Sequence, residues 1–310
     1  MFLNNSGHKT DKQDNVIKRP AFILYLAATI LLWSATPALA TIALKELDNF
    51  QLLFFVSSIA TVSLFIMTVF LKKLPILIQY TKKDLATMFL MGIIGIFLYH
   101  TCLFGSFTLA PAGQVNVANY LWPVFIVIFS IPILKEKFNW KTILAVVLSF
   151  VGVVLSLSKG TFSEFDTHYL FGYFLASLGA VCYGLFSVLG KKHNYDRVTS
   201  MFVYYASATI LIIPTTISVS TITMPQSLST IITVIILGVV MNSVAFIMWF
   251  KTLKLGNTHI TANAVYAIPF LAMVWTYYLN AEPLAPASIA GLALIILGIS
   301  VQVKNKHGST

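Results

Sequence analysis

The chain has 310 residues, of which 58% are hydrophobic and 10% are charged, with a mean hydropathy of +0.85 and a formal net charge of +10. A soluble domain carries about 25% charged residues, so this composition excludes an ordinary soluble enzyme or binding module. Apolar stretches of about 20 residues are long enough to span a bilayer as helices, and such stretches fill most of this chain.

The apolar stretches predict ten membrane-spanning helices joined by short connections. A polar, basic tail at residues 1–20 precedes them, and its composition is typical of disordered segments. The first span contains Ala38-Leu39-Ala40, which resembles a signal-peptidase site, but its apolar run is too long for a signal peptide. The predicted spans are Phe22–Leu44, Phe50–Leu71, Asp84–Phe104, Ala112–Leu134, Trp140–Ser158, His168–Leu189, Ser200–Ser220, Leu228–Phe250, Thr258–Leu279 and Ala285–Val303.

The distribution of positive charge tests this set of spans, because Lys and Arg gather in cytoplasmic segments. With the N-terminus in the cytoplasm, the ten spans place all of the 20 Lys and Arg residues except Lys45 and Lys159 on the cytoplasmic side. Both termini are then cytoplasmic. The basic charge faces anionic lipid at the bilayer surface, so lipid is the expected partner and nucleic acid is not.

An internal repeat relates the two halves of the chain at one offset of 146 residues. The pattern Ala118-x-Tyr120-x-x-Pro123 recurs as Ala264-x-Tyr266-x-x-Pro269. The same offset pairs Gly92 with Gly238, Phe104 with Phe250, Leu109 with Leu255, Glu136 with Glu282 and Gly152 with Gly298. We therefore predict a cytoplasmic tail at 1–20, a first five-helix repeat at 21–158, a linker at 159–167, a second repeat at 168–303 and a cytoplasmic tail at 304–310.

Five spans per repeat is an odd number, so the second repeat crosses the membrane upside down relative to the first. The predicted fold class is therefore an all-α integral membrane protein with ten transmembrane helices in two inverted repeats. Inverted repeats are typical of transporters, which bind substrate near the midplane where interrupted helices of the two halves meet. The fourth and ninth spans, which contain Pro123 and Pro269, are the expected interrupted helices.

The fourth span has the strongest local signal. Pro123 has no backbone N–H and pushes away the carbonyl of Asn119, and an unpaired carbonyl in lipid must find another partner. Asn116, Tyr120 and Trp122 lie beside this break. The pattern is typical of a helix whose middle faces a polar cavity at membrane depth.

Carboxylates are missing from the predicted membrane interior. All ten acidic residues lie in connections or at span ends, and we interpret Glu136 and Glu282 as anchors paired with nearby lysines. His100 lies inside the third span, where a buried structural role is favoured over a role in proton coupling. Cys102 and Cys182 lie in apolar runs and the histidines are scattered, so no disulfide, metal site or cofactor is predicted.

The candidate substrate-binding residues are uncharged polar and aromatic side chains within the spans. They are Trp33, Tyr99, His100, Asn116, Asn119, Tyr120, Trp122, Tyr183, Asn242, Asn263 and Tyr266, and the candidate helix breaks are Pro37, Pro123 and Pro269. Ser243 and Trp249 belong to the same intramembrane set, although Asn is also used to join helices and Trp is also used at bilayer interfaces. Such a cavity suits a neutral or zwitterionic solute.

These features resemble the EamA group of the drug/metabolite transporter superfamily, over Ala21 to Val303. More narrowly, Asn119-Tyr-Leu-Trp-Pro123, followed by Asn139-Trp140 and Val151-Gly-Val153, is similar to bacterial aromatic amino-acid exporters of that group. The resemblance implies an inner-membrane carrier with a central cavity built from spans 1, 3, 4, 6, 8 and 9. It also implies export of amino acids or related metabolites.

The expected function is movement of a small amino acid or related metabolite by alternating access, by facilitated diffusion rather than obligatory proton exchange. Export of an aromatic or neutral amino acid is favoured, and carriage or import of choline, a nucleoside or S-adenosylmethionine stays open, as does a homodimer. A membrane enzyme is disfavoured because the spans contain no Ser/His/Asp set, metal cluster or P-loop. A purely structural subunit is disfavoured because it has no use for a polar midplane.

Overall fold

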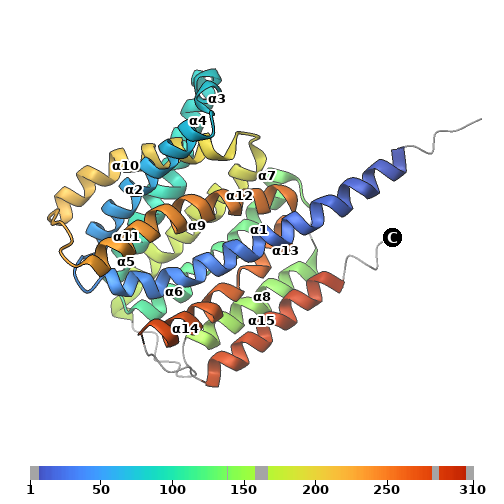
Figure 1. Ribbon diagram of the computed structural model, residues 1–310. Helices are drawn as coiled ribbons and strands as arrows, with labels where there is room; N and C mark the ends of the chain where they lie inside the picture. The colour runs from blue at the N-terminus through green and yellow to red at the C-terminus, as the bar shows by residue number, and fades with distance from the viewer. Residues whose placement is uncertain (1–6, 138, 158–166, 281–285, 305–310) are drawn as a thin grey trace, which may run out of the picture.

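The computed structural model describes residues 7–137, 139–157, 167–280 and 286–304, and all regular secondary structure in these ranges is helical (Figure 1). In the first repeat the elements are α1 Gly7–Ala43, α2 Asn49–Phe70, α3 Leu74–Gln79, α4 Lys82–Gly92, η1 Ile93–Leu98, α5 Tyr99–Phe107, α6 Ala112–Asn119, α7 Trp122–Leu134 and α8 Trp140–Leu157. In the second they are η2 Thr167–Tyr169, α9 Leu170–Lys192, α10 Arg197–Val219, α11 Leu228–Ile236, η3 Leu237–Val244, α12 Ala245–Leu255, α13 Thr258–Ala264, α14 Ala267–Asn280 and α15 Pro286–Lys304.

The helices confirm the predicted membrane fold. Among the described residues, eight helical segments are long and apolar enough to cross a bilayer, and two shorter apolar helices lie at Trp140–Leu155 and Ile289–Gly298. Each of the ten falls at a predicted span. The two shorter ones belong to α8 and α15, which pack along each other at one side of the bundle (Figure 1). The chain is a multi-pass membrane protein.

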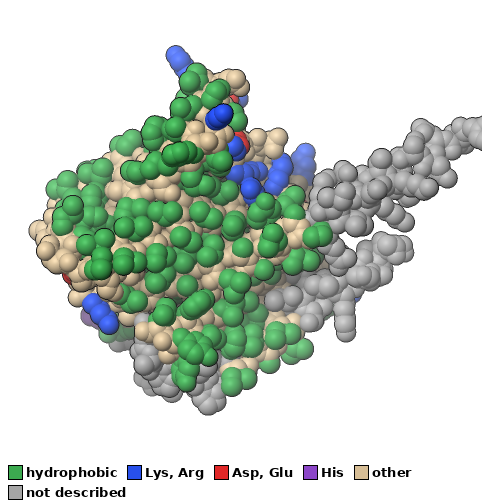
Figure 2. Space-filling view, in the orientation of Figure 1, with side chains coloured by type: hydrophobic (Ala, Val, Ile, Leu, Met, Phe, Trp, Pro, Cys, Tyr) green, Lys and Arg blue, Asp and Glu red, His purple; other side chains and the backbone are tan. Residues whose placement is uncertain are grey.

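The surface of the bundle is suited to lipid. Figure 2 shows a broad hydrophobic surface over the long helices, whereas Lys and Arg side chains gather near the end from which α3 and α4 project. Large apolar side chains such as Leu24, Phe70 and Ile78 are well exposed. Because such exposure is unfavourable in water and favourable in hydrocarbon, the apolar surface marks the part of the molecule that the bilayer covers.

Helix α1 differs from the expectation at two places. It begins at Gly7, so the segment predicted to be a disordered tail continues the first span as helix. A formed helix extends more easily than a new one nucleates, because each added residue contributes one hydrogen bond. The helix also continues through Pro37, where a break was expected. Packing of α1 against α12 and α14 holds the helix together on both sides of that proline.

The two halves repeat each other in local geometry as well as in sequence. The π-helical segments η1 and η3 lie at corresponding positions, since an offset of 146 residues carries 93–98 onto 239–244. The helix break between α6 and α7 corresponds in the same way to the break between α13 and α14. π-Helical turns are rare and occur mostly at functional sites, so their repetition directs attention to the space between them.

Helix α9 occupies the centre of this arrangement. It packs against η1, α5, α6 and α7 of the first half and against α12 of the second. Much of its surface is therefore buried by protein, including the whole of Phe186 and nearly all of Tyr183. The largest hydrophobic core joins α9 to both halves, and it forms the base on which the functional site is built.

Candidate functional site

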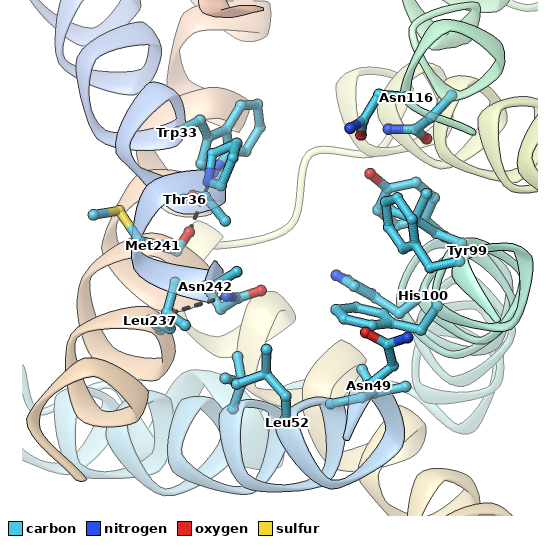
Figure 3. Close-up of a pocket in the computed structure, with 18 of the residues that line it drawn as sticks. Trp33, Thr36, Asn49, Leu52, Tyr99, His100, Asn116, Leu237, Met241 and Asn242 are labelled. Carbon is cyan, nitrogen blue, oxygen red and sulfur yellow. Dashed lines mark hydrogen bonds between the residues drawn. The ribbon is translucent and has the colours of Figure 1, made fainter. Parts of the chain in front are cut away.

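A cavity of about 520 Å³ lies between the two halves of the bundle. In Figure 3, Trp33, Thr36 and Met241 lie on one wall and Tyr99 and His100 lie on the opposite wall. The walls come from α1 and η3 on one side and from α5 and α6 on the other, and α2 covers a third side. This volume is in the range of pockets that hold one small molecule.

The structure brings together most of the residues that the sequence singled out. The cavity is lined by Trp33, Tyr99, His100, Asn116, Asn119, Tyr120, Trp122, Tyr183 and Asn242, and by Pro37 among the prolines. Asn263 and Tyr266 do not line it and are fully buried elsewhere. Pro123 and Pro269 lie in the first turns of α7 and α14, where a missing N–H costs little because that group has no partner within the helix.

Several lining residues had no distinguishing signal in the sequence. Thr36, Ser57 and Phe246 lie within apolar runs, and Asn49 lies where a helix cap is expected. A threonine or serine in a membrane helix commonly bonds to its own backbone, so its type alone does not mark it as a cavity residue. Only the packing of α1, α2 and α12 shows that these positions share one space.

Polar side chains in the walls bond to backbone carbonyls of the two π-helical segments. His100 bonds through Nδ1 to the carbonyl of Ile96 at 2.8 Å, and Asn242 donates from Nδ2 to the carbonyl of Leu237 at 2.9 Å. Trp33 donates from its indole N–H to the carbonyl of Met241 at 3.2 Å. Polar groups at membrane depth need partners within the protein, so these bonds fix the three side chains at the cavity wall.

The bond to Ile96 determines what His100 offers a ligand. A carbonyl oxygen only accepts hydrogen bonds, so Nδ1 of His100 carries the proton in the neutral ring. The other ring nitrogen, Nε2, is then an acceptor. His100 therefore presents an acceptor to the cavity, and it stands against the ring of Tyr99 with the two ring centroids 4.7 Å apart.

Asn119 contributes a second acceptor. It is the last residue of α6, directly before the helix break, and only 8% of it is exposed. Its side-chain oxygen has no hydrogen-bond partner among the described residues. A buried acceptor without a partner costs about 1–3 kcal/mol, so a donor from a ligand would relieve this cost.

Aromatic rings form the floor of the cavity. Trp33 meets the rings of Phe246, Trp122 and Tyr183 edge-to-face, at centroid distances of 5.1, 6.4 and 6.3 Å. Trp122 and Tyr183 lie 5.1 Å apart at nearly right angles. Rings at these angles hold one another in place and leave apolar faces and edges for a flat hydrophobic group or an ammonium.

No Asp, Glu, Lys or Arg occurs among the described residues that line the cavity. Within the same described part of the chain, no group of three or more His, Cys, Asp or Glu is placed to hold a metal ion. The site is therefore an uncharged, partly aromatic chamber with acceptors at His100 and Asn119.

A helical membrane protein built of two repeats around a chamber of this size is a membrane transporter in architecture. The EamA-like transporter family matches residues 20–158 and 170–303, so the chain belongs to this family and carries two of its domains. The protein is accordingly a transporter and not an enzyme.

The comparisons with individual proteins agree on this class and differ in detail. An uncharacterized transporter from Archaeoglobus fulgidus is 27% identical over 289 residues, which cover 92% of this chain and 98% of that protein. The aromatic amino acid exporter YddG from Ancylobacter novellus is 28% identical over 221 residues, covering 68% of this chain and 73% of that one. A crystal structure with a TM-score of 0.82 and 24% identity covers 94% of this chain and 99% of its own, and it supports the fold alone.

Proposed function

We propose that this protein carries a small neutral or zwitterionic metabolite by alternating access, and that it exports an aromatic or other neutral amino acid. The observation that carries the proposal is the uncharged chamber, in which an aromatic floor lies below two hydrogen-bond acceptors. The similarity to an aromatic amino acid exporter supports the same substrate class.

The chamber offers a separate place for each part of an amino acid. The ammonium group meets the acceptors of His100 and Asn119 and the faces of nearby rings. The carboxylate meets donors, which the Tyr99 hydroxyl and the Asn116 amide provide on the same wall. An aromatic or aliphatic side chain packs against Trp33 and Trp122 on the floor.

Phosphorylated solutes fit the chamber poorly. Recognition of phosphate generally uses Arg or Lys, and neither occurs among the described lining residues. A permanent cation such as choline would find the aromatic rings but no carboxylate. Choline, nucleosides and S-adenosylmethionine therefore serve as competitors in the test rather than as the first choice of substrate.

The test is uptake of radiolabelled phenylalanine into proteoliposomes, with protein-free liposomes as the control. We expect saturable uptake without a pH gradient, and we expect competition by neutral amino acids but not by sugar phosphates. Uptake that is competed only by choline or a nucleoside would overturn the amino-acid assignment. Uptake that requires a pH gradient would overturn facilitated diffusion and identify His100 as the first candidate for proton coupling.

We further propose that the protein lies in the plasma (inner) membrane with both termini in the cytoplasm. The distribution of Lys and Arg along the sequence supports this orientation, because such residues gather on the cytoplasmic side. A fluorescent protein fused to the C-terminus should fold and fluoresce in the cytoplasm. A fusion that fluoresces only in the opposite compartment would overturn the orientation.

A further inference from the structure

The chamber has a mouth on one side, whereas the other side of the bundle is closed. Leu44, Asn49 and Phe107 line the chamber and lie at or next to the ends of their helices, which places the mouth there. Beyond the aromatic floor, Phe186 packs edge-to-face on Phe250 with the ring centroids 5.2 Å apart, and both rings are fully buried. A solute in the chamber therefore has a path to one face of the membrane only.

Two glycines allow the aromatic rings on the closed side to pack directly against helix backbones. A Cβ atom added at Gly95 would lie 1.9 Å from the ring of Phe186, and one added at Gly190 would lie 2.0 Å from the ring of Phe250. Such distances are far shorter than any van der Waals contact, so only glycine permits the two rings to lie directly on neighbouring helix backbones. The rings form a plug between the chamber and the closed face.

A cluster of polar side chains, here called the inner lock, lies on the far side of this plug. It consists of Ser130, Glu136, Lys191, Thr258 and His259. It joins three helix ends, namely the end of α7, the end of α9 and the start of α13. The lock therefore ties the first half of the chain to the second.

Glu136 is the centre of the inner lock. Its carboxylate lies 3.2 Å from Nζ of Lys191 and 3.1 Å from Nε2 of His259, and it accepts a hydrogen bond from the Thr258 hydroxyl at 2.5 Å. Lys191 also donates to the Thr258 hydroxyl at 2.6 Å. The side chains of Glu136 and Lys191 are less than one-fifth exposed, so removal of either charge leaves the opposite charge largely buried without its ion-pair partner. Lys191 would keep its hydrogen bond to the Gly256 carbonyl, and Glu136 would keep its contact with His259.

The second helix break follows the inner lock along α13. The polar side chains at this break have no hydrogen-bond partners among the described residues. Asn263 and Tyr266 are completely buried. Neither the amide nitrogen and oxygen of Asn263 nor the hydroxyl of Tyr266 has a hydrogen-bond partner among the described residues. His259 and Asn263 are four residues apart in α13 and so occupy one face of this short helix.

The internal repeat suggests a role for these unpartnered groups. Tyr120, at the first break, lines the open chamber, and Tyr266 is its counterpart at the second break. In a carrier built from inverted repeats, the surroundings of the two counterparts exchange when the open side changes. The groups that lack partners in the present state would then face a water-filled space in the other.

We propose that α13 is a gate, held shut by the Glu136–Lys191 ion pair, and that Asn263 and Tyr266 contact the polar part of the transported solute when the gate is open. The gate rests on the proposed carrier function. Asn263 and Tyr266 form a second polar contact site, used on the side of the membrane opposite the mouth of the chamber.

Cysteine labelling tests the gate without any knowledge of the substrate. The chain has two cysteines, Cys102 and Cys182, and their replacement by alanine gives a background for the single variants Thr36→Cys and Asn263→Cys. A membrane-impermeant methanethiosulfonate reagent is applied to each face of sealed vesicles. We expect Thr36→Cys to react from one face, and Asn263→Cys to react slowly and only from the other.

The lock is then opened by Glu136→Gln, with Lys191→Gln as a second variant should the first fail to fold. We expect the labelling rate of Asn263→Cys to rise at least tenfold in either background. Lys73→Gln is the matched control, because it breaks the separate Lys73–Asp196 ion pair and leaves α13 untouched. Equal labelling in the lock and control backgrounds, or labelling of Asn263→Cys from the face that labels Thr36→Cys, would overturn the gate.

The contact with solute is tested by Tyr266→Phe. Loss of an unpartnered buried hydroxyl should leave the melting temperature unchanged or higher, while the rate of transport falls at least fivefold. Tyr278→Phe, at an exposed position, is the control and should change neither quantity. Unchanged transport would overturn the contact. Failure of phenylalanine transport in every variant, with the expected labelling pattern intact, would instead reject the proposed substrate and leave the gate standing.

Discussion

The two helix breaks share their backbone geometry but differ in what surrounds them. At the first break, Asn119 and Tyr120 border an open chamber. At the second, Asn263 and Tyr266 are sealed behind an aromatic plug and an ion pair. The difference teaches that a repeat specifies which positions have equivalent backbone roles, whereas packing and ion pairs determine which of the two sites is accessible in a given state.

The largest expected difference between the two breaks concerns the chamber floor, where Trp122 and Ile268 are repeat counterparts. It is measured by comparing their alanine variants in stability and in transport. Both line the chamber, but Trp122 also holds Trp33 and Tyr183 in place. We expect Trp122→Ala to lower the free energy of unfolding by about 3–5 kcal/mol and to reduce phenylalanine transport more than tenfold. Ile268→Ala should cost about 2–5 kcal/mol and should reduce transport less than threefold.

Urea unfolding in detergent and initial rates of uptake in liposomes measure these two quantities separately. Equal loss of transport in the two variants, at equal amounts of folded protein, would show that the aromatic floor has no special role.

A smaller effect, on the KM for the substrate, is expected when a polar residue at the first break is replaced by the apolar residue found at the second. Asn119 corresponds to Val265 in the repeat. Asn119→Val therefore removes the unpartnered acceptor and introduces the apolar side chain that stands at the counterpart position. A hydrogen bond to a charged group contributes about 1.5–3 kcal/mol, so the KM for an amino acid should rise about ten- to a hundredfold. The substitution also removes the side-chain hydrogen bond between Asn119 and Tyr99, so the melting temperature should fall only slightly, by the share of that one bond.

Substrates without an ammonium group sharpen this prediction. The KM for a deaminated analogue such as phenylpropionate should be the same for Asn119→Val and the unaltered protein. A parallel rise for both compounds would mean that Asn119 shapes the chamber rather than pairing with the ammonium group.

The smallest effect concerns the mouth of the chamber, where Glu46 ties the α1–α2 connection to the start of α11. The backbone N–H of Gln226 and the hydroxyl of Ser227 donate to its carboxylate and lower the pKa of Glu46 from 4.5 to about 2. A lowered carboxyl pKa stabilises the fold above the unfolded pKa and loses that effect as pH falls through the folded pKa. Glu46 is solvent-exposed, so its contribution is small.

We therefore expect Glu46→Gln to melt slightly below the unaltered protein at pH 7, with a difference that shrinks as the pH falls from about 4.5 to about 2. Thermal unfolding of the two proteins across this range measures it. A difference that grows on acidification would contradict the assignment, whereas Lys45→Gln, which removes a charge from the same connection, should show no such pH dependence.

The sequence allowed the fold to be predicted closely, because the signals involved are local. A run such as Phe50–Leu71 has the length and polarity of a membrane span in any surroundings. The repeat of Tyr120 and Pro123 at Tyr266 and Pro269 likewise needs no structure to be seen. The chamber residues at the first break could be proposed because Asn116, Asn119 and Tyr120 lie directly beside a proline within an apolar run.

The inner lock could not be predicted, because its members are far apart in the sequence. The sequence predicts that Glu136 anchors a nearby lysine, and the structure pairs it with Lys191, which is 55 residues away along the chain, and with His259, which is 123 residues away. In the sequence, His259 is one of six scattered histidines, and nothing near it marks it as a partner of Glu136. The repeat counterpart, Glu282, lies outside the described residues. Which break is open depends on such long-range pairs, and no local pattern contains that information.

The π-helical turns beside the chamber have a mechanical consequence. A π-helical turn has i→i+5 hydrogen bonds and so takes up about one residue more than an α-helical turn. It acts as a one-residue insertion, and the insertion shifts along the helix when neighbouring hydrogen bonds change between the two patterns. Passage of such an insertion beneath His100 or Asn242 would rotate that side chain by roughly 100° about the helix axis, the angle of one α-helical residue. A wall residue could thus turn away from a bound solute while every helix stays in the bilayer.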